Sequence, residues 1–245
     1  LGAVRIENGI IAEIMPVSAE GIDCGGRCLA PGIIDIGVKI GEPGERHKES
    51  FRTAGRSAAA GGVTTMVTRP DTTPAIDSPE LLDYFSRRAA ALGQVNVLPM
   101  AALTKGRDGQ EMTEIGFLKD AGAVAFTDGD RPVQNPKTLQ RALVYAADLN
   151  ALVMAHPQEP TLSKGASATS GPLASLMGLP AVSPMAERIQ LERDIALVEM
   201  TGARYHADQI TTAAALPALT RAKDAGLRVT AGVSAHHLTL NQFDI

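Results

Sequence analysis

The chain has 245 residues, a formal net charge of −4, 44% hydrophobic residues and 20% charged residues, as expected of one large soluble domain or of a barrel with a small appendage. The acidic balance offers no basic surface for nucleic acid, and no apolar run approaches the roughly 20 residues of a membrane span. No secretory leader opens the chain, and the two cysteines, Cys24 and Cys28, lack a second pair with which to hold zinc. We therefore expect a cytoplasmic protein with reduced thiols that binds neither nucleic acid nor membrane.

The sequence of residues 1–30 predicts a small β element. Two apolar runs, Ala3–Ile6 and Ile10–Met15, flank Asn8-Gly9, and Asn-Gly between apolar runs is a strong hairpin signal. The segment is too short to bury a core alone, so we expect it to form part of a small β subdomain.

From residue 31 onward, apolar runs of strand length alternate with helical stretches, which predicts parallel strands covered on both faces by helices. The strand candidates are Ile33–Ile40, Thr64–Thr68, Asn96–Leu103, Ala123–Thr127, Ala151–Ala155, Arg204–Gln209 and Arg228–Val233. The helix candidates are Glu49–Ala60, Pro79–Leu92, Pro136–Leu149, Ala186–Thr201 and Ala213–Ala225. Many helices are followed by glycine, where a left-handed cap costs least, as at Gly61-Gly62, Gly93, Gly122, Gly202 and Gly226.

This alternation of strands and helices favours a (β/α)8 barrel over a doubly wound sheet of five or six strands. No G-x-G-x-x-G string follows the first strand, which argues against a dinucleotide-binding sheet. The seventh strand candidate is followed at once by the end of the sequence, and an open barrel exposes a sheet edge. We predict an α/β TIM barrel over residues 31–245 that carries strands 1–7 and lacks its last βα unit. Both barrel and subdomain would then be incomplete, and we expect the natural chain to continue past Ile245.

One connection is unusually long. Residues 157–184 are rich in Gly, Ser, Ala and Pro and show no clear period. Connections of this length are usually lids, binding segments or disordered. In a barrel, this one leaves the carboxyl end of the fifth strand, on the face where active sites lie, so we expect a long loop or lid.

Several short strings stand in a fixed order along the chain. They are Leu29-Ala30-Pro31-Gly32-Ile33-Ile34-Asp35, Gly41-Glu42-Pro43-Gly44, Lys48-Glu49, Ala58-Ala59-Ala60-Gly61-Gly62-Val63-Thr64-Thr65, Pro70-Asp71-Thr72-Thr73-Pro74, Ala125-Phe126-Thr127-Asp128-Gly129, Gly178-Leu179-Pro180 and Val233-Ser234-Ala235-His236-His237-Leu238. In this order and spacing they resemble the dihydroorotases, a branch of the metal-dependent cyclic amidohydrolases. Allantoinases and dihydropyrimidinases share parts of the pattern.

The resemblance implies a (β/α)8 barrel with a small β domain built from both chain ends. It also implies the reversible ring closure of carbamoyl aspartate to dihydroorotate in pyrimidine biosynthesis. In the family a zinc centre lowers the pKa of a bound water, so that hydroxide can attack the ring amide. That chemistry requires imidazole and carboxylate ligands that converge at the strand ends.

The first strand departs from the family's pattern. The family ends this strand in His-x-His, followed two positions later by a substrate-binding arginine, where this chain has Gly37, Lys39 and Gly41. Glycine has no ligand atom, and a lysine ammonium repels a dication. We hypothesise that Lys39 instead supplies its own charge to the vacated metal site, as a stabilising group. Asp71 replaces an asparagine that contacts substrate in the family, and its charge would repel an anionic substrate.

Two further metal positions keep a ligand type. His156, at the end of the fifth strand, matches a metal histidine, and either Asp128 or Gly129 falls at a carboxylate position. On the sixth strand Gln209 replaces a metal histidine. We interpret His156 and Asp128 as vestigial metal ligands, with hydrogen bonding at the strand ends as their alternative role, and His206 as structural.

These substitutions lead to three hypotheses. The first is a dihydroorotase-like pseudoenzyme with a degenerate zinc site and no cofactor, which acts as a structural or regulatory partner of aspartate carbamoyltransferase in a homo- or hetero-oligomer, as inactive homologues of the family do. The second is an active hydrolase of dihydroorotate or another cyclic amide, which holds zinc through His156, Asp128 and residues beyond Ile245. The third is a small-molecule binder that uses the emptied barrel mouth.

Overall fold

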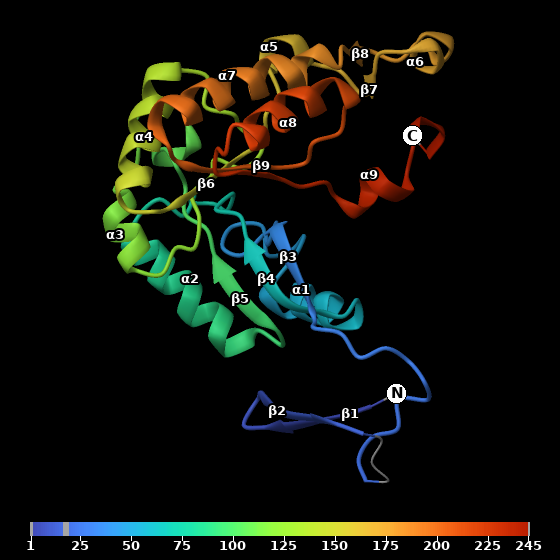
Figure 1. Cartoon of the computed structure of the whole chain (residues 1–245). Helices are drawn as coiled ribbons and strands as arrows, with labels where there is room; N and C mark the ends of the chain where they lie inside the picture. The colour runs from blue at the N-terminus through green and yellow to red at the C-terminus, as the bar shows by residue number, and fades with distance from the viewer. Residues whose placement is uncertain (1, 17–19, 245) are drawn as a thin grey trace. The chain divides into compact units, whose positions relative to one another are not determined.

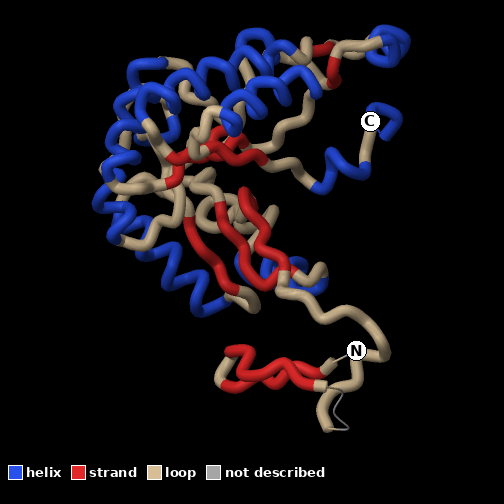
Figure 2. The backbone as a smooth tube through the Cα atoms, in the orientation of Figure 1, coloured by secondary structure: helices blue, strands red, loops and turns tan. Residues whose placement is uncertain are grey.

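The computed structural model describes residues 2–16 and 20–244. The chain divides into two units, residues 1–32 and 33–245, and each is described by itself. Figure 1 labels the helices and strands, and Figure 2 separates helix, strand and loop along the backbone. No helix among the described residues is long and apolar enough to cross a membrane.

The first unit contains the predicted hairpin. Strands β1 (Ala3–Glu7) and β2 (Ile10–Met15) pair antiparallel, and the turn residues Asn8 and Gly9 both have positive φ, 52° and 77°. Positive φ at both positions is the geometry of the two-residue turn that Asn-Gly favours, so the hairpin prediction is confirmed. The hairpin leaves isoleucines exposed on its own strands: Ile6, Ile10, Ile11 and Ile14. It therefore does not bury a core by itself.

The second unit contains two parallel three-stranded sheets (Figure 1). The first has the order β3-β4-β5, with bounds Ile33–Val38, Val63–Thr68 and Asn96–Pro99. The second has the order β10-β9-β6, with bounds Val229–Ala231, Arg204–Ala207 and Leu152–Ala155. Five of the six strands fall within predicted strand segments, and β4 begins one residue before its segment, which confirms the parallel α/β class.

The fourth predicted strand, Ala123–Thr127, is not a strand but a chain of isolated bridges. Phe126 pairs in parallel with Ala101 on one side and with Val153 on the other, so this segment links the two sheets. The Ala101 amide donates to the Ala125 carbonyl at 3.0 Å. Pro99, two residues before Ala101, has no N–H and cannot donate the preceding bond of this ladder. The ladder is therefore too short to count as a strand, although its position was predicted correctly.

The resulting array of seven parallel segments is open among the described residues. Strand β3 pairs only with β4, and β10 pairs only with β9. Barrel closure is therefore not seen among the described residues, because neither edge strand has a second partner here, and the prediction was of seven strands without the last βα unit.

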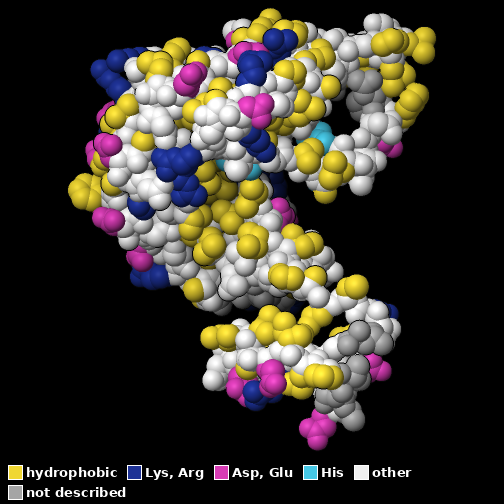
Figure 3. Space-filling model, in the orientation of Figure 1, with side chains coloured by type: hydrophobic (Ala, Val, Ile, Leu, Met, Phe, Trp, Pro, Cys, Tyr) yellow, Lys and Arg dark blue, Asp and Glu magenta, His cyan; other side chains and the backbone are white. Residues whose placement is uncertain are grey.

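Apolar side chains remain exposed on one face of the first sheet (Figure 3). The register pairs Ile36 with Val67 and Val67 with Leu98, so these three side chains share a face. Ile36 is 44% exposed and Leu98 41% exposed, while Val67 is buried. In a closed barrel this face would be interior, so the open array leaves part of its apolar face in water.

Helices lie along the strands at close to the predicted positions. Their bounds are α1 Phe51–Ala60, α2 Pro79–Leu92, α4 Pro136–Asp148, α7 Met185–Thr201 and α8 Leu216–Asp224, the last preceded by the 3-10 turn η2 Ala213–Ala215. Ser50, Ser78 and Asn135 begin three of them, each accepting a hydrogen bond from a first-turn amide. Shorter helices that the sequence did not predict are η1 Lys105–Arg107, α3 Ile115–Asp120, α9 Ala235–Thr239 and η3 Gln242–Asp244.

The expectation of left-handed glycine caps holds at most of the named positions and fails at Gly93. Gly202 and Gly226, for example, have φ of 68° and 71°. Gly93 has φ of −68°, and a Cβ there would lie 2.8 Å from the Ala89 carbonyl oxygen. Close approach of the backbone, rather than a left-handed cap, therefore requires glycine at Gly93.

Residues 157–184 form short elements of their own. These are α5 Pro160–Ser163, β7 Ala168–Thr169, α6 Pro172–Met177 and β8 Ala181–Val182. Strands β7 and β8 pair in parallel, and the Glu159 side chain accepts a hydrogen bond from the Leu162 amide at the start of α5. The segment is thus locally ordered by hydrogen bonds, although its sequence has no regular period, and its role as a lid stays a prediction.

A buried polar group fixes α7 on β9. The Tyr205 hydroxyl of β9 donates to the Asp194 carboxylate of α7 at 2.8 Å, and Arg193 donates to the same carboxylate. Burial raises the pKa of Asp194, and the Arg193 charge opposes that shift. A hydrogen bond to a buried charged group typically contributes about 1.5–3 kcal/mol, so this contact selects the helix position as strongly as a buried apolar side chain.

Candidate functional site

Chemistry-bearing side chains gather where the parallel strands end. The carboxyl ends of such strands meet at one edge, which is where barrel enzymes place their sites. We call the following residues the strand mouth: Gly37, Lys39, Arg69, Asp71, Arg107, Asp128, Gly129, His156, Asp208 and Gln209. Each stands at or just after a strand end, or, for Arg107, in the loop that adjoins it.

Gly37, near the end of β3, faces the side chains of Met154 and Asp208. A Cβ at this position would lie 3.5 Å from Cε of Met154 and 3.6 Å from Oδ2 of Asp208. Gly37 also has φ of 84°, a conformation that L side chains rarely adopt. The space in which the family places a histidine is therefore contacted by Asp208 and Met154.

Lys39 and Arg69 share the carboxylate of Asp71. The Lys39 Nζ lies 3.6 Å from Asp71 Oδ2, and Arg69 Nη2 donates to the same oxygen at 3.0 Å. The Asp71 side chain is 2% exposed and that of Arg69 14%, while Lys39 is half exposed. Lys39 also approaches Glu45, at 3.9 Å. The negative charge of Asp71 is thus offset by two cations, which reduces the repulsion of anions expected from Asp71 alone.

Gly41 lies in a turn that leaves no room for a side chain. A Cβ there would be 2.5 Å from the backbone oxygen of Glu45 and 3.1 Å from that of Glu49. Such distances are not seen for real side chains, so the turn would have to open to admit one. An arginine, which the family uses here to bind substrate, does not fit this turn.

Both oxygens of Asp128 are engaged by the neighbouring loop. Oδ1 accepts from the amides of Leu103 and Thr104 at 3.0 and 2.9 Å, and Oδ2 accepts from the Thr104 hydroxyl. Burial raises the pKa of Asp128, and these hydrogen bonds and the Arg107 charge oppose the shift. Asp128 therefore holds the loop that follows β5, a role that occupies its acceptor sites.

Gly129, rather than Asp128, faces the strand mouth. A Cβ on Gly129 would lie 3.2 Å from Nη2 of Arg107 and 3.8 Å from Cβ of Asp71. Of the two residues, Gly129 is the one whose side-chain position borders Arg107 and Asp71, and which of them matches the family's ligand position stays a prediction. Gly129 carries no ligand atom, and a guanidinium lies against it.

His156 and Gln209 line a cavity of about 390 Å³ between the strand ends and the 157–184 segment. His156 Nδ1 lies 3.4 Å from the Asp208 carbonyl oxygen. Glu187 also lines the cavity, with its carboxylate accepting four hydrogen bonds of 2.7–3.0 Å from Thr211 and Thr212. The lining is therefore polar, and its carboxylate is already committed to holding the loop after β9.

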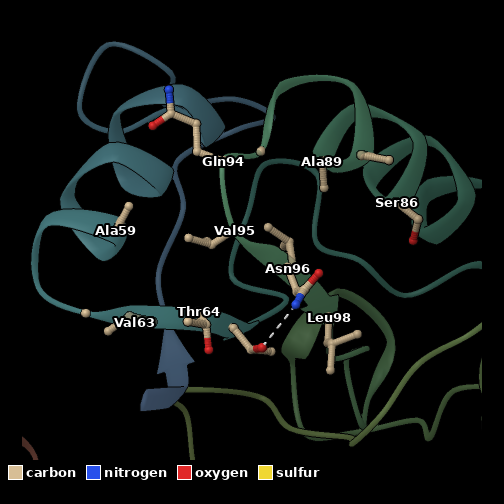
Figure 4. Close-up of a pocket in the computed structure, with 14 residues that line it drawn as sticks. Ala59, Val63, Thr64, Ser86, Ala89, Gln94, Val95, Asn96 and Leu98 are labelled. Atoms are coloured by element: carbon tan, nitrogen blue, oxygen red, sulfur yellow. Dashed lines mark hydrogen bonds between the residues drawn. The ribbon is translucent and has the colours of Figure 1, made fainter. Parts of the chain in front are cut away.

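A larger cavity, about 820 Å³, lies at the amino ends of β4 and β5, away from these residues (Figure 4). Its lining includes Asn96, whose side chain donates to Thr65 Oγ1 at 3.5 Å. None of its lining side chains is titratable, and Ala59, Ala89 and Leu98 contribute apolar surface. We therefore assign the chemistry-bearing site to the strand mouth.

His206 lies on β9, two residues before Asp208. Its Nδ1 is 2.8 Å from the Thr230 hydroxyl of β10, while a Cβ on Gly232 would lie 3.0 Å from its Nε2. Burial lowers the pKa of His206, and the charge of Asp208 opposes that shift. These contacts agree with the structural role expected for this histidine.

The described ranges, 2–16 and 20–244, contain no group of three or more His, Cys, Asp or Glu side chains arranged to hold a metal ion. Within the strand mouth, His156 is the one imidazole, and the nearest contact of its Nδ1 is a backbone carbonyl. The mouth instead brings together Lys39, Arg69 and Arg107 with carboxylates.

Comparison with known proteins assigns the chain to a family. The family model for dihydro-orotase-like proteins matches residues 26–215. This chain belongs to that family. It is 40% identical over 247 residues to the dihydroorotase of Bacillus caldolyticus, and 41% identical over 224 residues to that of a Wolbachia from Brugia malayi. The matches include 99% and 91% of this chain but 58% and 50% of those relatives. The chain thus spans about half the length of the curated relatives it matches.

Solved structures support the fold assignment. The L-hydantoinase of Arthrobacter aurescens superposes with a TM-score of 0.82 at 18% identity, and covers 99% of this chain and 56% of its own. The D-hydantoinase of Bacillus sp. AR9 gives a TM-score of 0.77 at 21% identity, with 98% and 55% covered. The α/β fold therefore matches amidohydrolase structures over about half their length.

Sequence reasoning missed Arg69, Arg107 and Asp208. Arg69 and Asp208 each follow a strand directly, and that position is a signal that could have found them. Arg107 lies in a loop between β5 and α3, 21 residues before the carbonyl of Asp128 that it contacts. No local pattern connects it to the strand mouth.

The depressed pKa of His206 predicts a pH dependence of stability. Burial disfavours the protonated form of His206 in the folded state, so the unfolded state binds the proton more readily. The free energy of unfolding is therefore highest above about pH 6.5 and decreases as pH falls from there through the folded-state pKa. In a His206→Gln variant the fall in Tm between about pH 8 and about pH 5 should be smaller than in the parent. The measurement is thermal unfolding across this pH range. His47→Gln, at an exposed loop histidine, is the matched control; an equal effect in both variants would contradict the assignment.

Proposed function

We propose that this dihydro-orotase-like chain has no hydrolase activity and serves as a structural or regulatory partner of aspartate carbamoyltransferase in pyrimidine biosynthesis. The observation that carries the proposal is the surroundings of Gly37 and Gly129, which by resemblance stand at or beside metal-ligand positions of the family. Neither residue has a ligand atom, and the space that a side chain would enter is bordered by Asp208 and Met154 at Gly37 and by Arg107 at Gly129.

The donors in the mouth do not fit a catalytic zinc centre, which takes three protein ligands and leaves one position open. Lys39 and Gln209 stand at two histidine positions, and Asp128 directs both oxygens to the 103–104 backbone and hydroxyl. His156 remains, and one imidazole does not make a zinc site. We derive no catalytic step through zinc for these residues.

A partner role is supported by what the chain retains. The family match extends over residues 26–215, and the parallel strands and their helices are kept although the ligand positions have changed. Loss of ligands together with retention of the fold is what selection for a binding surface would leave. We propose a cytoplasmic homo- or hetero-oligomer with aspartate carbamoyltransferase, by resemblance to inactive dihydroorotase homologues that assemble with that enzyme.

The cavity beside His156 favours a second candidate function, the binding of a small polar molecule. Its volume of about 390 Å³ and its lining of hydroxyl, amide and imidazole groups suit a compact ligand with several hydrogen-bonding atoms. A thermal-shift screen with pyrimidine precursors and dicarboxylates tests this function, because a ligand at 100 times its Kd stabilises by about 2.7 kcal/mol. A ligand whose stabilisation disappears in Gln209→Ala would support it, and no shift with any of them would contradict it.

The main proposal is tested by zinc content and turnover of the full-length protein expressed with added zinc. We expect fewer than about 0.1 zinc ions per chain, because a site needs at least three ligands, and no ring opening of dihydroorotate. We also expect tagged protein to retain aspartate carbamoyltransferase in a pull-down. One or more tightly held zinc ions with measurable turnover would instead favour the hydrolase hypothesis. Failure to retain the carbamoyltransferase would contradict the partner role alone.

A further inference from the structure

Arg107 has a backbone conformation that its residue type disfavours. Its φ is 58°, and it follows Gly106, whose φ is 57°. Residues with a Cβ rarely adopt this left-handed region, and glycine does so freely. The chain therefore accepts backbone strain at a position where glycine would relieve it, which calls for a compensating contact of the side chain.

The Arg107 side chain makes that contact inside the strand mouth. It is 9% exposed, its Nε donates to the backbone oxygen of Asp128 at 2.9 Å, and its Nη2 pairs with Asp130. The same Nη2 lies 3.2 Å from the point at which a Cβ of Gly129 would stand. The guanidinium thus occupies the space beside Gly129 into which a side chain would project.

The buried carboxylates of the strand mouth require compensation. Asp71, Asp128 and Asp208 are each less than 10% exposed, and a buried carboxylate is costly unless a positive charge or hydrogen bonds compensate it. Arg107 acts on Asp128, while Lys39 and Arg69 pair with Asp71. Burial raises the pKa of Asp208, against the opposing charges of His156, His206 and Arg69. Arg107 and Arg69 are the two largely buried cations of the mouth.

We propose that Arg107 is an internal substitute for a metal ion: a positioning residue whose guanidinium, with Lys39 and Arg69, compensates the carboxylates of the strand mouth. Gly129 is the complementary change, because only a residue without a side chain leaves the guanidinium its place. This inference rests on the proposal that the mouth carries no metal-dependent reaction. The proposal assigns part of the positive charge that stabilises the strand mouth to Arg107, a loop residue.

Because the Arg107 backbone is strained, the direction of the Tm change in Arg107→Gly tests the proposal. If its side chain contributes little, Arg107→Gly relieves the backbone and raises Tm, as glycine does at positive φ. If the guanidinium compensates the mouth, the same change lowers Tm by about 5 °C or more despite that relief. Asn150→Gly, at an exposed residue with φ of 51°, measures the relief minus the one hydrogen bond that the Asn150 side chain accepts from Arg228. A Tm of Arg107→Gly equal to or above that of the parent overturns the proposal.

Chemical rescue separates a lost charge from a general packing defect. Guanidinium at about 20 mM should raise the Tm of Arg107→Gly and leave the parent unchanged, with sodium chloride of equal ionic strength as control. If Arg107→Gly does not fold, Arg107→Lys and Arg107→Met decide, because both keep the strain and only lysine keeps the charge. The lysine variant should be the more stable, and equal stability overturns the proposal. Because these readouts use neither zinc nor substrate, their failure leaves the zinc-content test of the proposed function standing.

Discussion

Buried carboxylates at the ends of parallel strands must be compensated, and this constraint governs the strand mouth. Asp71 and Asp208 are buried, and a buried negative charge without a partner would destabilise the fold. In metal-dependent relatives a dication can meet that need. Here Arg69 and the half-exposed Lys39 pair with Asp71, and Arg107 pairs with Asp130 and acts on Asp128. Positive charge is therefore built into the chain.

The backbone arrangement explains why those charges meet. Phe126 joins the two parallel sheets through bridges to Ala101 and Val153, which places the loops after the strands along one edge. Asp128 then ties the loop after β5 to the segment after Phe126 through three hydrogen bonds, and this loop carries Arg107. The structural role of Asp128 thus positions the guanidinium that lies against Gly129. A residue expected as a vestigial ligand instead organises the loop around the mouth.

Local signals predicted much of the fold. Asn8-Gly9 predicted the hairpin, and the helix candidate Pro79–Leu92 matches α2, because both signals act within a few residues. The sequence predicted a full fourth strand at Ala123–Thr127, where the structure has isolated bridges. Pro99, in the neighbouring strand β5, has no N–H to donate to this segment, and the sequence of the segment itself does not reveal that. The alternation of strands and helices predicted seven parallel strands without the last βα unit, and the two edge strands have one partner each among the described residues.

The site was predicted where it depends on residue type and missed where it depends on distant contacts. Gly37 and Gln209 were identified because they lack or change a ligand group at a recognisable position. The choice between Asp128 and Gly129 required coordinates, since a one-residue shift reverses which side chain faces the mouth. Arg107 required them too, because its contacts with Asp128 and Asp130 link residues more than 20 positions apart.

The most direct measurement of the central claim is anomalous diffraction at the zinc edge from crystals of the full-length protein grown with excess zinc. The account predicts no anomalous peak in the strand mouth and density for the Arg107 guanidinium against Gly129. A peak within about 2.1 Å of His156, the distance of a zinc–imidazole bond, would contradict the account and return the mouth to metal chemistry.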